Sequence, residues 1–444
     1  MFKTLIISTL YLTVSFLFPS KVSLDFNISN ELDSLALLID QGSKNYKVFN
    51  RAAELSYLMD DMDGTGKYYK SALEKCTDPK QYDLIKGKFE SLKELQNELK
   101  LIQKTRDSGS IEQSLEEYKV LLNAYPDNSL IFYLIGITYQ KLRDLDNAGI
   151  YFIKSREQKP YVEKYSNAVL NISKNKTKSA ITLFKRGKIN ESIKELKSAI
   201  DIDPGYVTAY EKLAYIYNSS KVKEYDKSIS LLSSYSNIER QPKILYYLGD
   251  SYQKKGLYED AVNSYLKAVG IDQNYTKAYY QMGLCYNSLG KADEAINFLL
   301  NAIEINPDYS KAHETLAKVY LSKGKYENSI ESYNNAIKTI DKKGKKNLYK
   351  IYTYLSDACI VYGESLSENN NLFKDAKRYA YESISLKQNN PQAYYYLGLA
   401  ELHLCNQVAA EEALTRAKKD RQFKSSATNY LKNITYYLSE FGCK

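Results

Sequence analysis

Three consecutive stretches of 34 residues decide the fold of this chain: PKILYYLGDSYQKKGLYEDAVNSYLKAVGIDQNY at 242–275, TKAYYQMGLCYNSLGKADEAINFLLNAIEINPDY at 276–309 and SKAHETLAKVYLSKGKYENSIESYNNAIKTIDKK at 310–343. When they are aligned, the eighth position holds Gly249, Gly283 and Ala317, the eleventh Tyr252, Tyr286 and Tyr320, the twentieth Ala261, Ala295 and Ser329, and the twenty-seventh Ala268, Ala302 and Ala336. A fixed period of this length indicates a helical solenoid, in which each unit buries its apolar face against its neighbours. Such a fold implies a binding function and leaves the partner open.

The spacing resembles that of the tetratricopeptide repeat (TPR) family. One set of matching positions consists of Leu245, Leu248, Gly249, Tyr252, Gly256, Ala261, Tyr265 and Ala268. The resemblance implies an all-α fold, a right-handed superhelical solenoid of about ten antiparallel helix-turn-helix repeats. We expect an array over 46–424 with units at about 46–79, 95–128, 129–162, 173–206, 207–241, 242–275, 276–309, 310–343, 349–390 and 391–424. The two earliest units match least well, and the unit at 349–390 contains an insertion.

Each recurring residue type has a local physical reason. Small residues at positions 8, 20 and 27 let two helix backbones cross closely, where a larger side chain would overpack the contact. Position 15 recurs as Gly109, Gly187, Gly256, Gly290 and Gly324, where a left-handed residue ends the first helix without steric cost. Proline follows the second helix in several units, where its missing backbone donor ends the helix at little cost. The pattern therefore predicts turns as well as packed faces.

The N-terminus differs from the repeats. Residues 5–18 form an uncharged apolar run after Lys3, too short for a spanning helix at about 20 residues and suited to the core of a signal peptide. We expect 1–23 to be a signal peptide or N-terminal anchor and the protein to be exported, that is periplasmic, envelope-associated or secreted. Residues 24–45 are expected to form an N-terminal cap with a helix starting near Asn30 or Asp33, and 425–444 a C-terminal capping helix.

The chain shows no pattern for catalysis, a metal or a cofactor. Its five cysteines are widely spread, and Cys285 and Cys359 stand at positions that take small buried residues. The odd count leaves a free thiol or an intermolecular bond open. His313 occupies a packing position and His403 lies near the end of a helix, so a zinc site is not expected. We therefore expect a protein that is not an enzyme and has no cofactor.

Charge gives little support for nucleic-acid binding. The net charge of +9 results from 62 basic and 53 acidic residues, which are mostly interspersed. The densest basic cluster, at 342–350, lies between two units and is expected to be a solvated connection, with contact to anionic lipid, polysaccharide or nucleic acid as the alternative. We expect protein partners, no nucleic acid and no metal; association with a membrane or the cell wall is left open.

The resemblance also implies where a partner binds. In TPR proteins the residues of the first helix that do not pack line the concave face of the superhelix. Projected onto this chain, the candidate partner-binding residues are Tyr133, Tyr215, Lys243, Tyr246, Tyr247, Asp250, Lys277, Tyr280, Gln281, Lys311, Tyr395 and Tyr396. Tyrosine is a favoured interface anchor, although many of these rings are equally suited to packing between repeats. The lysine and asparagine clamp that some TPR domains use for a terminal carboxylate is absent, because its positions hold pairs such as Tyr246 and Asp250.

These observations predict a non-catalytic scaffold that binds a peptide or partner segment in the concave groove, in an exported or envelope complex. One alternative is a structural or glycan-binding component of the envelope. Another is a regulatory TPR subunit of an enzyme complex whose catalytic chain is separate.

Overall fold

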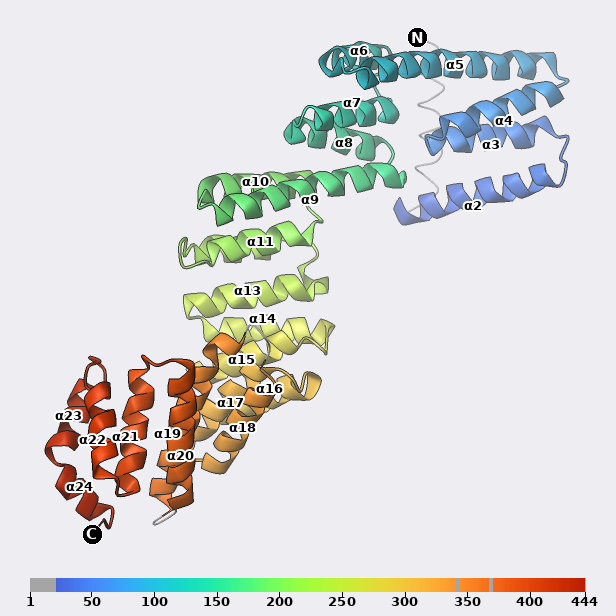
Figure 1. Cartoon of the computed structure of the whole chain (residues 1–444). Helices are drawn as coiled ribbons and strands as arrows, with labels where there is room; N and C mark the ends of the chain where they lie inside the picture. Colours follow the sequence, from blue (N-terminus) through green and yellow to red (C-terminus); the bar gives the residue numbers. More distant parts are fainter. Residues whose placement is uncertain (1–20, 341–343, 367–369, 444) are drawn as a thin grey trace. The chain divides into compact units, whose positions relative to one another are not determined.

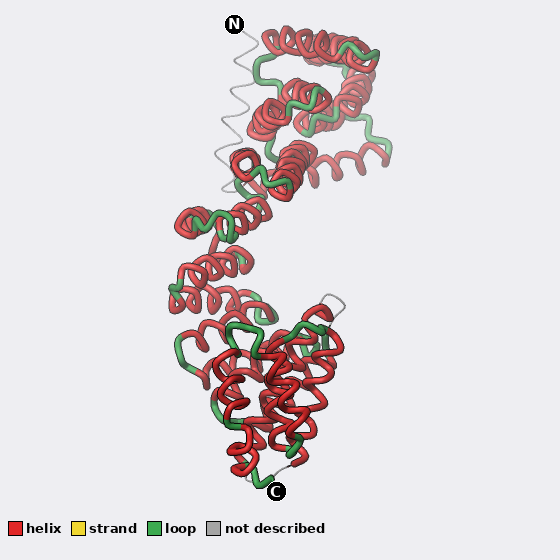
Figure 2. The backbone as a smooth tube through the Cα atoms, turned by 60° about the vertical axis from the view of Figure 1, so that its left-hand side comes forward, coloured by secondary structure: helices red, strands yellow, loops and turns green. Residues whose placement is uncertain are grey.

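The described part of the chain is helical throughout. The computed structural model describes residues 21–340, 344–366 and 370–443, and these contain helices and connecting loops but no strand (Figures 1 and 2). The α-helices are α2 (Lys21–Asp40), α3 (Tyr46–Leu58), α4 (Met62–Lys75), α5 (Pro79–Asp107), α6 (Ile111–Ala124), α7 (Ser129–Lys141), α8 (Leu145–Gln158), α9 (Glu163–Lys185), α10 (Ile189–Ile202), α11 (Val207–Tyr217), α12 (Tyr225–Ser233), α13 (Pro242–Lys255), α14 (Tyr258–Ile271), α15 (Thr276–Ser288), α16 (Ala292–Ile305), α17 (Ser310–Ser322), α18 (Tyr326–Lys338), α19 (Leu348–Ser365), α20 (Asn370–Leu386), α21 (Pro391–His403), α22 (Gln407–Ala417), α23 (Lys424–Lys432) and α24 (Ile434–Glu440). Two short 3₁₀ turns, η1 (Ile238–Arg240) and η2 (Gly344–Asn347), complete the set.

The helices pack as consecutive pairs within two compact units, Met1–Ile216 (unit 1) and Tyr217–Lys444 (unit 2). In unit 1, α3 packs on α4, α7 on α8 and α9 on α10; in unit 2 the pairs are α13 with α14, α15 with α16, α17 with α18, α19 with α20 and α21 with α22. The second helix of a pair also contacts the first helix of the next pair in several places, for example α14 with α15 and α16 with α17. The architecture is the all-α solenoid of helix pairs that the period predicts.

The small residues at position 8 lie where two helices of a pair cross. A Cβ atom on Gly249 would lie 2.6 Å from the Tyr265 ring, and one on Gly283 would lie 2.7 Å from Cγ of Leu299. Both distances are far below van der Waals contact, so a side chain here forces its neighbour to move. The expected reason for glycine at this position is therefore confirmed.

Position 15 is left-handed, as its glycines predict. Gly109, Gly187, Gly256, Gly290 and Gly324 have φ angles of 100°, 81°, 88°, 73° and 71°. Asp60, Arg143 and Cys405 stand at the same position of their own units, with φ angles of 54°, 62° and 61°. Because a left-handed residue with a Cβ costs about 1–2 kcal/mol, a side chain here needs compensation from elsewhere. Asp60 and Cys405 both bond to distant parts of the chain.

Three residues that were expected to fill the core do so. Cys285 and Cys359 are buried, at 0% and 1% exposure, and burial raises the pKa of each thiol to about 12. His313 is also buried, with its Nε2 atom 2.9 Å from the carbonyl oxygen of Pro307. These side chains are structural.

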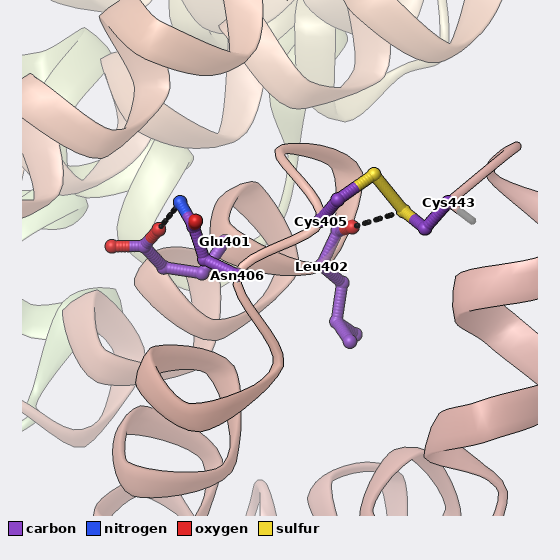
Figure 3. Close-up of a disulfide and its surroundings, with 5 residues drawn as sticks. All are labelled: Glu401, Leu402, Cys405, Asn406 and Cys443. Carbon is purple, nitrogen blue, oxygen red and sulfur yellow. Dashed lines mark hydrogen bonds between the residues drawn. A yellow bond between two sulfur atoms is a disulfide. The ribbon is translucent and has the colours of Figure 1, made fainter.

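The C-terminal segment differs from the single capping helix expected over 425–444. It forms two short helices, α23 and α24, and Cys443 beyond them forms a disulfide with Cys405 in the turn between α21 and α22 (Figure 3). Beside this bond, the His403 ring lies between Phe373 and Phe441, with centroid distances of 4.0 Å and 3.8 Å. The sequence left the odd cysteine count open, and the structure pairs two of the five within the chain.

At the other end, α2 begins at Lys21, earlier than the start expected near Asn30 or Asp33. Most of the export segment expected at 1–23 lies outside the described residues. Among the helices of the described ranges, none combines the length and the apolar character that a membrane span requires.

Candidate partner-binding surface

The first helices of the repeats in unit 2 form a polar and aromatic groove. Helix α15 contacts both α13 and α17, so the three first helices lie side by side (Figure 1). A pocket of about 540 Å³ opens between α15 and α17, which we call the α15–α17 groove. Its lining consists of Tyr280, Leu284 and Asn287 from α15 and Lys311, Glu314, Thr315, Lys318, Val319 and Ser322 from α17. Within each helix these residues recur at intervals of three or four, so each set lies along one helix face.

The tyrosines beside the groove also hold the repeats together. The Tyr246 ring lies 5.4 Å, 5.6 Å and 5.2 Å from the rings of Tyr247, Tyr265 and Tyr275, centroid to centroid. Its hydroxyl accepts a hydrogen bond of 3.5 Å from the Gln281 amide, and burial raises its pKa. Such aromatic clusters contribute beyond the area they bury. Tyr246 is therefore a packing residue.

Tyr280 has a more open position. Its ring lies 5.2 Å from that of Tyr309, and its hydroxyl lies 3.5 Å from Oγ1 of Thr315 across the groove. It is half-buried and forms part of the pocket wall. A rigid aromatic wall with a polar tip suits an interface anchor.

Lysines set the charge of the groove. Lys318 forms an ion pair of 2.6 Å with Glu314, and its ammonium also lies 4.6 Å from the centroid of the Tyr354 ring. Lys311 in the lining and Lys277, which lies outside the lining three residues before Tyr280 on α15, are exposed, and neither has an ion-pair or hydrogen-bond partner for its side chain within the described ranges. The acidic group of the groove is thus already neutralised, and two cations remain available.

Two aspartates on first helices of unit 2 have a raised pKa. Asp250 on α13 accepts a hydrogen bond of 3.1 Å from the Asn218 amide and lies 3.8 Å from Lys254. Desolvation outweighs both partners and raises the pKa of Asp250. On α19, burial raises the pKa of Asp357 to about 6, with Glu364 adding to the effect and a hydrogen bond to Tyr396 opposing it. Both carboxyls are costly to ionise where they stand.

The C-terminal cap occupies the expected binding residues of the last repeat. Tyr395 on α21 lies 5.2 Å from Phe423 and 6.3 Å from Tyr430, again between ring centroids. Tyr396 is half-buried beside Tyr395, and its hydroxyl lies 3.4 Å from the Gln392 amide. Tyr395 therefore helps to anchor the end of the chain.

In unit 1, a buried polar cluster joins repeats that are far apart in sequence. The Asp60 carboxylate accepts hydrogen bonds from Ser129 at 2.9 Å and from Tyr165, and forms an ion pair of 2.5 Å with Lys159. The Lys159 ammonium also donates to the Tyr57 carbonyl oxygen at 2.8 Å. The first repeat is thereby tied to the ends of α8 and α9, a contact that nearest-neighbour packing alone does not provide. We call Asp60, Ser129, Lys159 and Tyr165 the Asp60 cluster.

The cluster accounts for the position of Tyr133. Its ring lies 5.3 Å from that of Tyr165 and 5.5 Å from that of Phe152, so it packs under the cluster. Tyr215, also in unit 1, is 59% exposed, and its ring lies edge-on to that of Phe184 at 6.1 Å between centroids.

Comparisons with known proteins agree with the geometry. The model described as "Tetratricopeptide repeat" matches residues 276–309, a second of that description matches 310–341, and one described as "TPR repeat" matches 182–219 and 249–290. This chain is a tetratricopeptide repeat protein. Among curated proteins, the TPR repeat-containing protein YpiA of Bacillus subtilis is 26% identical over 182 residues, which cover 36% of this chain and 43% of that protein. The chain therefore aligns with less than half of that relative's length.

Solved structures give distant likenesses. The C-terminal part of a TPR repeat-containing protein from Cytophaga hutchinsonii is 20% identical, with a TM-score of 0.45, and the match covers 57% of this chain and 99% of that one. A tetratricopeptide repeat protein from Parabacteroides merdae is 17% identical, with a TM-score of 0.39, and the match covers 59% and 97%.

The TPR frame explains which expected residues come together. Lys277, Tyr280, Gln281 and Lys311 gather on α15 and α17, with Lys243, Tyr246, Tyr247 and Asp250 on the adjacent α13. Tyr133 and Tyr215 belong to unit 1, and Tyr395 packs against the C-terminal cap with Tyr396 beside it. Whether any of them binds a partner remains a prediction.

Several lining residues were missing from the expected set. Thr315 and Ser322 stand at TPR positions 6 and 13, so the repeat frame could have selected them. They were not in the expected set because it consists mainly of tyrosine and charged residues. Val319 stands at position 10 and had no sequence signal. Asp357, outside this lining, stands at position 9 of the unit 349–390 and ahead of its insertion, so the frame could have selected it as well. Among the described residues, no group of three His, Cys, Asp or Glu side chains is arranged to hold a metal ion.

Proposed function

We propose that this TPR protein is a non-catalytic scaffold that holds a segment of another protein in the α15–α17 groove, within an exported or envelope complex. The observation that carries the proposal is the groove itself. Its walls come from helix positions that repeat packing leaves uncovered, and it combines an apolar floor at Leu284 and Val319 with polar rims. Concave sites of this composition suit recognition of a polypeptide segment.

The groove in unit 2 is favoured over the first repeats of unit 1. The Asp60 cluster already occupies the turn of the first repeat and the ends of α8 and α9, and Tyr133 packs against it. A partner at that place would have to displace a buried ion pair. Lys311 and Asn287 in the α15–α17 groove are exposed, and a partner can reach them without any such loss.

Two features support an exported location. The disulfide between Cys405 and Cys443 requires an oxidising compartment, since cytosolic thiols are generally kept reduced. The uncharged run at 5–18 has the length of a signal-peptide core. N-terminal sequencing of the mature protein tests the location: a start after the apolar run supports export, and an intact Met1 with both cysteines reduced contradicts it.

Site-specific crosslinking tests the binding function. A photo-crosslinking amino acid replaces Asn287 in the groove or, as a control, the exposed Asn297 on α16, and the full chain is irradiated in its native cell. We expect a discrete protein adduct from position 287 and none from 297. In the presence of Ser322→Arg, which fills the groove from an exposed position, the adduct is expected to disappear. Equal adducts from both positions, or an adduct insensitive to the arginine, would contradict binding in this groove.

A further inference from the structure

We propose that the α15–α17 groove recognises an acidic, extended polypeptide segment, with Lys277 and Lys311 each pairing with a carboxylate of the partner. This inference rests on the proposed function and names the class of segment that the scaffold binds. It follows from the charge, the spacing and the hydrogen-bonding groups of the groove.

The charge of the groove determines the charge that the bound segment must carry. Lys277 and Lys311 stand at the same position of successive repeats, 34 residues apart, and both are exposed without an ion-pair partner among the described residues. Glu314, the acidic residue in the lining, is held at 2.6 Å by Lys318. A basic segment would therefore meet two uncompensated cations and a carboxylate already paired. An acidic segment gains two ion pairs and loses none.

Spacing determines how the acidic residues are arranged. Because α15 contacts α17 directly, their axes are expected to be about 8–10 Å apart, and equivalent residues on the two helices are separated by a similar distance. An extended chain rises about 3.1–3.4 Å per residue, so residues three apart are separated by roughly 10 Å. In a polyproline II conformation, with three residues per turn, those two residues also share one face. Carboxylates at i and i+3 thus match the two lysines.

The remaining groups favour an extended segment over a helix. The exposed Asn287 amide lines the groove and can bond backbone groups of a ligand. The Ser322 hydroxyl donates to the Val319 carbonyl oxygen at 2.8 Å and can still accept from a ligand N–H. A helix satisfies its backbone internally, whereas an extended segment presents unpaired N–H and C=O groups that need such partners. Between them, Leu284, Val319 and the Tyr280 ring offer a floor for one apolar side chain between the two acidic ones.

Carboxylates near the groove argue against nucleic acid as the occupant. Asp250 on the adjacent first helix has one cation close by, Lys254 at 3.8 Å, and Glu314 lies within the lining. A continuous phosphate backbone would carry negative charge past both carboxylates and be repelled by them. A peptide can have acidic side chains only at the positions that face the lysines.

Selection from a peptide library tests the inference. The full chain, with its disulfide intact, is panned against random dodecapeptides displayed on phage, in parallel with the Ser322→Arg variant. Peptides enriched only by the unmodified chain are then measured against the double variant Lys277→Gln/Lys311→Gln. The matched control is Lys291→Gln/Lys374→Gln, which removes the same charge from exposed positions outside the groove.

We expect enriched peptides to carry acidic residues three apart around an apolar residue. Since an exposed ion pair contributes about 0.2–1 kcal/mol, losing two lowers affinity by about 2- to 30-fold, and more strongly at low salt. The control variant should bind as the unmodified chain does. Enriched peptides without acidic residues, or equal affinity for the groove variant and its control, overturn the acidic preference and leave the scaffold function standing. Absence of any peptide that distinguishes the unmodified chain from Ser322→Arg overturns both.

Discussion

Substitution of Asp60 should destabilise unit 1 more than any surface change of the same charge. The Asp60 side chain is 4% exposed and pairs with Lys159, which is 13% exposed. Asp60→Asn keeps the size, tolerates the left-handed backbone at φ 54° and can still accept hydrogen bonds from Ser129 and Tyr165. It removes the charge and replaces the oxygen that faces Lys159 by an NH2 donor. Asp60→Ala removes the charge and every acceptor.

The expected magnitudes follow from what each variant leaves unpaired. Breaking a buried ion pair by removing one partner costs about 3–5 kcal/mol, which we expect for Asp60→Ala. Asp60→Asn loses the charge on one buried bond, so we expect about 1.5–3 kcal/mol. The exposed Asp63→Asn, three residues away, removes the same charge and should cost no more than about 0.5 kcal/mol.

Hydrogen exchange read by mass spectrometry localises the effect, because a solenoid can lose structure in one part while another stays folded. Peptides from α3–α4 and α8–α9 should exchange faster in both Asp60 variants. Peptides from 276–341 in unit 2 serve as the internal reference and should be unchanged.

The pH dependence gives a second check. Desolvation lowers the pKa of Lys159, and the Asp60 charge opposes this. In Asp60→Asn the folded-state pKa falls further below the unfolded value, so the unfolded state binds more protons and stability rises with pH through that interval. The deficit of Asp60→Asn relative to Asp63→Asn should therefore shrink as pH approaches the pKa of free lysine. A deficit below about 0.5 kcal/mol, or faster exchange spread equally over both units, would refute the role assigned to the cluster.

Three further substitutions test other parts of the structure. The pKa of Asp357 is raised to about 6 in the folded state, so between pH about 4 and 6 the folded state binds more protons than the unfolded state and the contribution of Asp357 to stability falls as pH rises. Asp357→Asn should remove that fall and stabilise unit 2 at neutral pH by up to about 3 kcal/mol. Thermal unfolding followed across this pH range measures the effect. Gly283→Ala should destabilise the protein by about 1–3 kcal/mol in denaturant titrations, because its Cβ would lie 2.7 Å from Leu299. Its control, Gly270→Ala, has no atom within 4 Å of the added Cβ and should stabilise the protein by about 0.5–1 kcal/mol. Destabilisation by both variants would show that the close helix crossing is not the cause. Cys443→Ser removes the bond that closes a loop with a sequence separation of 38 residues and should lower the stability of the C-terminal cap by about 3–4 kcal/mol. Faster hydrogen exchange at 424–443 would show this loss. Unchanged exchange there would argue that aromatic packing alone holds the cap.

The repeat frame gave the local structure of the array because its causes are local. Gly249 and Gly283 are fixed by the distance between two helices of the same pair, and Gly290 by the turn that joins them. Both conditions involve residues fewer than 34 positions apart, so they recur in sequence with the period itself. Asp357 stands at position 9 of the unit 349–390, ahead of its insertion, so the frame reaches it, but the burial that raises its pKa follows from the tertiary structure.

The candidate site was predictable only in part. Tyr280 and Lys311 were found because the frame marks positions that do not pack, and both line the α15–α17 groove. The same rule could not separate Tyr280 from Tyr395, which stands at the same repeat position. The difference lies in Phe423 and Tyr430, which belong to a cap that has no repeat pattern.

By itself, the sequence determined the all-α repeat architecture, its frame and the buried fillers Cys285 and His313, since each depends on contacts within a repeat or with its neighbour. Only the tertiary structure decided what spans the repeats. Asp60 and Cys405 both stand at the left-handed fifteenth position, where the frame expects glycine, and they appear in sequence as simple departures from it. The structure shows that Asp60 bonds to Lys159 and Tyr165 about 100 residues away, and Cys405 to Cys443. A sequence period arises from contacts that recur between each repeat and the next one. Contacts across several repeats occur once in the chain, so they leave no period.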